Sequence, residues 1–187
     1  MDIEIRTTCE GDVGAVRRVH EGAFGVGEGE VIGALAVGLL GDATAEPVVS
    51  LLAERGGEAV GHVIFTRVRI KGDGGENFGV DTRILAPLAV IPSEQGCGIG
   101  SGLVKRGLGL LKAAGCGLVF VYGDPGYYGR FGFGPAMDAG LTVPYEIPVS
   151  HRDAWMVLGL QKGLIGGVRG VVRCAASLDK PEHWVVD

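Results

Sequence analysis

Apolar and polar residues follow two different periods along the chain, and the changes of period predict where strands give way to helices. Ile3 and Ile5 alternate with polar residues, which indicates an edge strand. After the polar stretch 10–12, apolar positions recur at helical spacing over Val13–Phe24. A second helix is expected over Glu28–Leu40, weakened by its internal glycines. The N-terminal part of the chain therefore predicts one strand followed by two helices.

The middle of the chain alternates between β-rich runs and glycine-rich turns. Residues 48–53 and 59–70 predict two strands that form a hairpin around Arg55-Gly56-Gly57. Residues 71–81 are rich in glycine and predict a loop, which leads into a strand over Thr82–Val90. This part of the chain is therefore expected to supply three successive strands with no helix between them.

A long helix and a short buried strand are expected next. The helix covers residues 101–114, with Gly115 as its C-terminal stop, and the strand covers Leu118–Tyr122. After a helical turn around Tyr127 and Tyr128, further strands are expected over residues 141–149, 155–160 and 168–173.

The order of these elements predicts an α+β domain in three layers. One mixed, largely antiparallel, twisted sheet would be flanked by helices, and a parallel strand pair would bracket the long helix. A chain of 187 residues has the size of one domain, so residues 1–187 are expected to form a single unit.

Composition and charge narrow the classes of function. The 17 basic and 22 acidic residues are interspersed and give a net charge of -5, which argues against a nucleic acid partner. The N-terminus lacks a basic region and the longest apolar run, residues 31–40, is too short to span a bilayer, so we expect a cytoplasmic protein with no membrane partner. No metal is expected, because the scattered cysteines fit neither a zinc site nor a disulfide framework; they are Cys9, Cys97, Cys116 and Cys174.

The most distinctive segment runs from an apolar strand through a short polar turn into glycine-rich backbone that opens a helix. It reads Val90-Ile91-Pro92-Ser93-Glu94-Gln95-Gly96-Cys97-Gly98-Ile99-Gly100-Ser101. The alternating glycines leave backbone N–H groups uncovered, and a helix start adds its own free N–H groups and the positive end of the helix dipole. The segment therefore predicts a binding site for a phosphate or pyrophosphate group.

Two motifs together resemble the GNAT superfamily of N-acetyltransferases. Gln95-x-x-Gly98-x-Gly100, after a strand ending in Val90-x-Pro92, is similar to the acetyl-CoA loop of that superfamily. The downstream string Asp124-Pro125-Gly126-Tyr127-Tyr128-Gly129-Arg130-Phe131-Gly132-Phe133 resembles its Tyr-x-x-x-Gly-Phe element, in the Asp-Pro-x-Tyr-Tyr-x-x-Phe-Gly-Phe form of a little-characterised bacterial branch. The resemblance implies a GNAT-like fold in which Thr82–Val90 and Leu118–Tyr122 are the parallel pair and splay apart around the cofactor.

The resemblance also implies an activity, the transfer of an acetyl group from acetyl-CoA to a primary amine by direct attack in a ternary complex. Backbone groups of Leu88, Ala89 and Val90 would pair with the pantetheine arm and polarise the thioester carbonyl. Backbone amides of the glycine-rich segment would hold the pyrophosphate. These residues are Gln95, Gly96, Cys97, Gly98, Ile99, Gly100 and Ser101.

Tyr128 is the candidate general acid and also a cofactor contact. It occupies the tyrosine of Tyr-x-x-x-Gly-Phe, where an unperturbed phenol can protonate a departing thiolate at neutral pH. Tyr127 is the competing phenol, and both rings can instead serve only to pack. Glu30 is a candidate catalytic residue on the acceptor side, and His62 lies in a strand beside the expected cleft. A lone strand histidine is more often structural, and water can relay the proton as well as either residue.

Asp124 and Arg130 are interpreted as a helix cap and a solvated charge. The acceptor, a small-molecule or peptide amine, is not specified by the sequence, and exposed strands near the C-terminus are compatible with a homodimer.

Two other classes of function stay open. One is a non-catalytic acyl-CoA-binding regulatory domain. The other is an NAD-binding oxidoreductase, suggested by Gly96-x-Gly98-x-x-Ser101 after a strand. Against it, the third glycine is a serine, the turn before the first glycine is long, and hairpin strands precede the motif.

Overall fold

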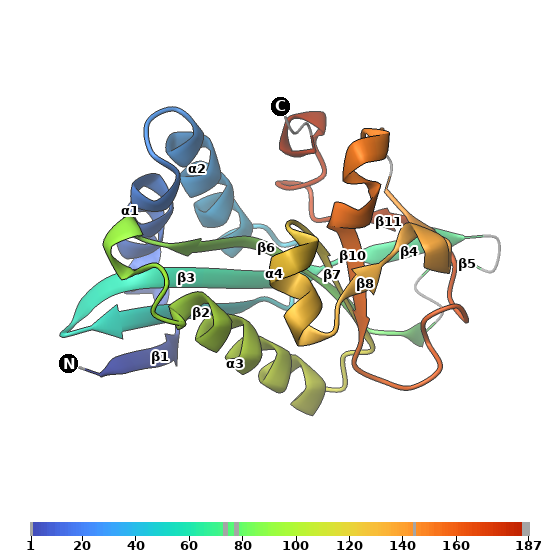
Figure 1. The fold of residues 1–187 in the computed structure, drawn as a ribbon, viewed down its shortest axis with the longest axis horizontal. Helices are drawn as coiled ribbons and strands as arrows, with labels where there is room; N and C mark the ends of the chain where they lie inside the picture. Colours follow the sequence, from blue (N-terminus) through green and yellow to red (C-terminus); the bar gives the residue numbers. More distant parts are fainter. Residues whose placement is uncertain (1, 73–74, 77–78, 144, 185–187) are drawn as a thin grey trace.

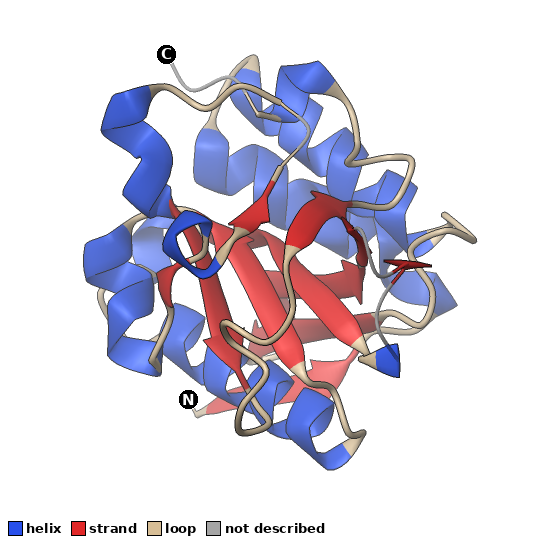
Figure 2. Cartoon of the chain, turned by 90° about the vertical axis from the view of Figure 1, so that its right-hand side faces the viewer, coloured by secondary structure: helices blue, strands red, loops and turns tan. Residues whose placement is uncertain are grey.

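The computed structural model describes residues 2–72, 75–76, 79–143 and 145–184, and places helices on both sides of a central layer of strands (Figures 1 and 2). The helices are α1 (Val13–Phe24), α2 (Glu28–Leu40), α3 (Ile99–Ala113) and α4 (Pro125–Tyr128). The strands are β1 (Ile3–Thr7), β2 (Val49–Arg55), β3 (Glu58–Arg67), β4 (Arg69–Gly72), β5 (Gly75–Glu76), β6 (Thr82–Val90), β7 (Leu118–Tyr122), β8 (Gly134–Pro135), β9 (Leu141–Thr142), β10 (Trp155–Gly159) and β11 (Gly170–Arg173).

The strands of the described chain form two sheets. The larger has the order β1-β2-β3-β6-β7-β10-β8, and the smaller has the order β5-β4-β11-β9. In the larger sheet β6 and β7 run parallel, and every other neighbouring pair is antiparallel. Helices α1 and α2 cover one face of this sheet and α3 covers the other (Figure 1). The predicted α+β fold with a largely antiparallel sheet and one parallel pair is confirmed.

This topology decides against one alternative. A dinucleotide-binding fold needs a series of parallel strands joined by helices. In the larger sheet of the described chain the parallel pair β6 and β7 stands alone among antiparallel neighbours. The NAD-binding oxidoreductase alternative is therefore wrong.

Small residues set the distance at which the helices pack. A Cβ on Gly107 of α3 would overlap the ring of Phe65 on β3, so only glycine allows α3 to lie this close to the sheet. A Cβ on Gly29 of α2 would lie 2.6 Å from the carbonyl oxygen of Glu21 on α1. The glycines of α2 that lower its helix propensity therefore also allow α1 and α2 to pack as a close pair.

The parallel pairing of β6 and β7 ends halfway along β6. Their register runs from Thr82 opposite Leu118 to Leu85 opposite Val121. Beyond Leu85, β6 continues beside β3 as far as Val90, and no described strand pairs with its other edge. The two strands separate here, which leaves the backbone of residues 86–90 with one open edge.

Three predicted boundaries in the β regions are wrong. The strand expected over 59–70 is two strands, because β3 ends at Arg67 and the chain passes to the smaller sheet as β4. Val68 and Ile70 stay buried across this change, so the alternating pattern shows no break. The loop expected over 71–81 contains the last two residues of β4 and the whole of β5, and these two strands pair with each other. Residues 73–74 and 77–78 of this segment lie outside the described residues.

The third wrong boundary is the strand expected over 141–149. It is limited to β9, and residues Val149–Ala154 form a 3-10 helix. Pro148 directly precedes that helix and has no N–H group to donate to a neighbouring strand. Residue 144 lies outside the described residues.

No helix in the described parts of the chain is long and apolar enough to cross a membrane.

Candidate active site

The open edge of β6 presents backbone hydrogen-bonding groups at alternate residues. The Ile91 N–H group donates to the Val60 carbonyl oxygen at 3.0 Å, which makes these two residues a hydrogen-bonded pair. Bonded and non-bonded pairs alternate in an antiparallel ladder. Ala89 therefore points its backbone groups toward β3, whereas Leu88 and Val90 point theirs toward the open side. The structure thus separates the three residues expected to pair with pantetheine into two on the open edge and one facing β3.

The glycine-rich turn is anchored to the end of β6. The side-chain Nε2 of Gln95 donates to the Val90 carbonyl oxygen at 2.9 Å. Gly96 and Gly98 have φ values of 76° and 81°, a left-handed conformation that favours glycine. Helix α3 begins at Ile99, directly after Gly98, so the free N–H groups of its first turn lie at this turn.

A cavity of about 490 Å³, called here the glycine-loop cavity, lies over the start of α3. It brings together the predicted strand edge, the turn and the helix start. Its lining consists of Leu88, Val90, Glu94, Gln95, Gly96, Gly98, Ile99, Gly100, Ser101, Tyr127 and Arg130. Cys97 belongs to the same turn but is exposed and does not line this cavity.

Tyr127 and Arg130 close the glycine-loop cavity from the opposite side. The guanidinium carbon of Arg130 lies 4.1 Å from the centroid of the Tyr127 ring, and its Nε donates to the Tyr127 carbonyl oxygen at 2.8 Å. A Cβ on Gly100 would lie 2.7 Å from the Tyr127 hydroxyl oxygen, so a side chain at position 100 would collide with this phenol. Arg130, interpreted from the sequence as a solvated charge, is the cation that lines this cavity.

A larger cavity of about 830 Å³, called here the α2 cavity, lies at the same strand edge. Leu88 lines both cavities, so the open part of β6 lies between them. The α2 cavity is lined from the helices by Phe24, Glu28, Val31, Ile32 and Leu35, from β6 by Ile84, Leu85, Ala86, Pro87 and Leu88, from the β7–α4 region by Tyr122, Gly123, Asp124 and Tyr128, and from the C-terminal segment by Leu178, Glu182, His183 and Trp184.

The two adjacent phenols belong to different cavities. Tyr127 lines the glycine-loop cavity and Tyr128 lines the α2 cavity. Tyr128 is 9% exposed, and its ring meets those of Tyr127 and Phe133 edge to face at centroid distances of 4.9 and 5.9 Å. Burial raises the pKa of Tyr128 well above its ordinary value. The hydroxyl keeps its proton at neutral pH, as an unperturbed phenol does, but it is a weaker acid than the unperturbed phenol assumed from the sequence.

Asp124 caps helix α4, as expected from the sequence. Its carboxylate accepts a hydrogen bond from the Gly126 N–H group at 2.9 Å. The cap fixes the start of the single turn of α4 that contains both tyrosines, and Asp124 also lines the α2 cavity.

The structure places Glu30 outside the α2 cavity that Tyr128 lines. Glu30 is exposed and lines a separate surface depression with Arg17 and Glu21, whereas Glu28 is the acidic residue of α2 that lines the α2 cavity. Residues two positions apart point in different directions from a helix. The apolar residues of α2 could have indicated this, because Glu28 precedes Val31 by three positions and stands on the same face.

His62 is a buried structural residue that helps to hold α1 on the sheet. Its Nε2 lies 2.8 Å from Ser50 Oγ, and its Nδ1 lies 2.8 Å from Nε2 of His20 on α1. Burial lowers the pKa of His62 to about 3 and that of His20 to about 4, so both imidazoles are neutral at pH 7. The pair lines neither cavity, which agrees with the structural interpretation of a strand histidine.

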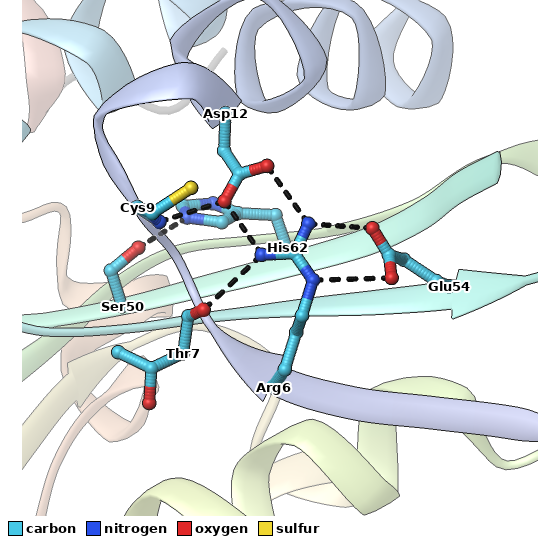
Figure 3. A network of polar contacts seen from close by, with 7 residues as sticks. All are labelled: Arg6, Thr7, Cys9, Asp12, Ser50, Glu54 and His62. Atoms are coloured by element: carbon cyan, nitrogen blue, oxygen red, sulfur yellow. Dashed lines mark hydrogen bonds and ion pairs between the residues drawn. The ribbon is translucent and has the colours of Figure 1, made fainter. Parts of the chain in front are cut away.

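An ion-pair network beside His62 ties the start of α1 to the first two strands (Figure 3). Arg6 on β1 bridges Asp12, which immediately precedes α1, and Glu54 on β2, with N–O distances of 2.7 and 2.6 Å. Asp12 also accepts the Cys9 N–H group at 2.7 Å. Together with the histidine pair, this network fixes the helix that carries Phe24 to the wall of the α2 cavity.

The C-terminal segment reaches the α2 cavity because it is bonded to the chain that follows α2. The N–H groups of Ala176 and Ser177 donate to Thr44 Oγ1 and to the Asp42 carboxylate, both at 2.8 Å. Trp184 then stacks on Tyr122 at a centroid distance of 5.8 Å. Sequence analysis missed this wall, since the segment carries no periodic pattern that connects it to α2.

The sequence of this chain is similar to those of one protein family. Residues 4–136 match the family model described as acetyltransferase (GNAT) domain. A curated relative, the uncharacterized N-acetyltransferase YjhQ of Escherichia coli strain K12, is 41% identical over 170 residues, which cover 90% of each chain.

Solved structures give the same family at the level of fold. The GNAT family N-acetyltransferase YhbS from Escherichia coli, in complex with CoA, has a TM-score of 0.81 and 26% identity over 95% of this chain and 92% of its own. A GNAT family acetyltransferase from Brucella melitensis, in complex with acetyl-CoA, has a TM-score of 0.73 and 29% identity over 95% of this chain and 99% of its own.

Proposed function

Because the chain belongs to the GNAT acetyltransferase family, we propose that it transfers the acetyl group of acetyl-CoA to a primary amine by direct attack within a ternary complex. The observation that supports this most is the open edge of β6, which lies between two cavities that share Leu88. Two solved relatives are complexes with CoA or acetyl-CoA. One cavity would hold the cofactor phosphates and the other the acceptor.

The residues of the glycine-loop cavity fit a pyrophosphate. Backbone N–H groups at the start of α3 can donate to phosphate oxygens, and the absence of a side chain at Gly100 lets the Tyr127 hydroxyl approach this part of the backbone. Arg130 adds a positive charge at the same wall. Glu94 also lines the cavity, but its carboxylate is paired with Arg55 at 3.1 Å.

The open edge of β6 fits the pantetheine arm. Leu88 and Val90 offer backbone groups to an extended ligand in the way that a sheet edge accepts another strand. Of these groups, the Val90 carbonyl is already bonded to Gln95, so the Val90 N–H and the Leu88 groups carry this role. One such N–H group, pointing at the thioester oxygen, would stabilise the negative charge that develops there.

Acetyl-CoA supplies the activated acetyl group as a thioester when bound. The neutral amine attacks the thioester carbonyl, a C–N bond forms, and the C–S bond breaks. Tyr128 holds a proton at the α2 cavity wall and donates it to the departing sulfur, while the proton lost by the amine passes to water. The products are an N-acetylated amine and free CoA. Glu30 is not assigned a role, since it lies outside both cavities.

The experiment that tests this proposal combines cofactor binding with turnover. Calorimetry with acetyl-CoA measures binding, and detection of free thiol measures turnover with a panel of amines. Binding together with amine-dependent thiol release is the expected result. Binding without turnover of any amine would favour the non-catalytic acyl-CoA-binding domain, and absence of binding would contradict both.

A further inference from the structure

The charges that line the α2 cavity share one sign. The acidic residues of its lining are Glu28 from α2, Asp124 from the α4 cap and Glu182 from the C-terminal segment. Within the described part of the chain, neither lysine nor arginine lines this cavity. Its histidine, His183, is mostly neutral at pH 7, because burial lowers its pKa below the ordinary value. A bound molecule would therefore meet only negative or neutral side chains.

The remaining walls of the α2 cavity are apolar. Phe24 and Val31 at the helix side are 36% and 53% exposed, although both are large hydrophobic residues. Leu178 and Trp184 form the facing wall and are almost completely buried. Exposed apolar side chains that line a cavity are typical of a surface that a ligand covers.

We propose that the acceptor is a primary amine with an apolar carbon skeleton and no carboxylate, as in an arylalkylamine. This inference rests on the proposed function and names the substrate class of the same site. The three acidic residues attract the ammonium form of such a molecule, which loses one proton to water before the neutral amine attacks, and the apolar walls cover its skeleton. A free amino acid would bring its own carboxylate into a cavity that offers no cation to pair with it.

The glycine-loop cavity supports this assignment by contrast. Arg130 lines that cavity, and its one acidic residue, Glu94, is paired with Arg55. Anionic phosphates are therefore favoured at one end of the β6 edge and a cationic amine at the other. The opposite charges of the two cavities therefore favour acetyl-CoA in the glycine-loop cavity and the amine in the α2 cavity.

The first experiment compares four amines with acetyl-CoA held constant, using phenethylamine, phenylalanine, phenylalanine methyl ester and ethanolamine. We expect kcat/KM for phenethylamine to exceed that for phenylalanine by about 100-fold or more, because the carboxylate is repelled and unpaired. The methyl ester removes that charge and should recover most of the difference. Ethanolamine should be a poor acceptor, since it leaves the apolar walls uncovered.

The second experiment tests Glu28 with a matched control. Glu28→Gln should raise KM for phenethylamine about tenfold with a small change in kcat and an unchanged Kd for acetyl-CoA. Glu21→Gln removes an equal charge on the neighbouring helix, from a side chain that lines the separate depression, and should leave all three values unchanged. Glu28→Arg should reduce the preference for phenethylamine over phenylalanine about tenfold.

The outcomes separate this inference from the proposed function. Failure to bind acetyl-CoA would contradict the proposed function itself. Binding of acetyl-CoA with better turnover of phenylalanine or ethanolamine than of phenethylamine, or with no acetylation of the apolar amines, would overturn only the substrate class. Equal effects of Glu28→Gln and Glu21→Gln would also overturn it.

Discussion

The glycine-loop cavity and the α2 cavity lie at the same edge of β6 but are built in different ways. Most of the first comes from one continuous stretch, residues 88–101, closed by Tyr127 and Arg130. The second is assembled from four separate parts of the chain, between Phe24 and Trp184. In the proposed function the first would bind through backbone groups and the second through side chains. A site built from local backbone can therefore be recognised from one sequence motif, whereas a site built from side chains depends on how distant segments pack together.

The largest effect is expected from filling the backbone site. Gly100→Glu puts bulk against the Tyr127 hydroxyl and a negative charge where phosphates would bind, so it should abolish acetyl-CoA binding as measured by calorimetry. Gly109→Glu is the matched control, because Gly109 lies on the same helix and a Cβ there meets nothing within 4 Å. An affinity of Gly100→Glu for acetyl-CoA equal to that of the wild type would show that the cofactor does not bind in this cavity.

Next in size is the difference between the two tyrosines. Tyr128→Phe should lower kcat about 100-fold with little change in the Kd for acetyl-CoA, because it removes one proton donor at the α2 cavity and keeps the ring. Tyr127→Phe should change mainly the KM for acetyl-CoA, since that phenol lines the other cavity. Steady-state kinetics of the two variants side by side decides this. A larger loss of kcat in Tyr127→Phe would reverse the assignment.

Acidification should loosen the helix layer that forms the α2 cavity. His20 and His62 have lowered pKa values in the folded state, about 4 and about 3, so the unfolded chain binds more protons below pH 6.5. The free energy of unfolding should fall as the pH drops from 6.5 toward 4, by roughly 2 kcal/mol per histidine between pH 7.5 and 4.5. Urea unfolding at the two pH values measures this.

His183→Gln is the control for that pH dependence, because His183 is also shifted but lies in the C-terminal segment. The variant should retain most of the loss of stability. A wild-type free energy of unfolding that is equal at both pH values would show that the buried pair accepts protons in the folded state.

The smallest effect is expected from the cation of the glycine-loop cavity. Arg130→Gln should raise the Kd for acetyl-CoA about tenfold and weaken its salt dependence, with the KM for the amine unchanged. Arg106→Gln on the exposed side of α3 lines neither cavity and serves as the comparison. If the KM for the amine changed as much as the Kd for acetyl-CoA, the charge of Arg130 would act on both substrates and not on acetyl-CoA alone.

The sequence predicts the fold and the backbone of the glycine-rich turn, because both depend on local patterns. Periodicity places α1, α2 and β6 at their observed bounds, and the string from Gln95 to Ser101 places the turn, although α3 begins at Ile99, two residues before the predicted start of that helix. Glycine at a left-handed position and a helix N-terminus are properties of neighbouring residues, so they can be recognised without tertiary information.

Only the tertiary structure decides which side chains line the cavity proposed for the acceptor. Glu28 rather than Glu30 lines the α2 cavity because the rotation of α2 is set by its packing on α1 and the sheet. Glu182 and Trp184 join it because the C-terminal segment is bonded to the chain after α2, more than a hundred residues away in sequence. Periodicity along one segment carries no information about contacts between distant segments. The sequence by itself therefore determines the fold class and the glycine-rich turn proposed to hold the cofactor, and the packing of the folded chain determines the cavity proposed for the amine.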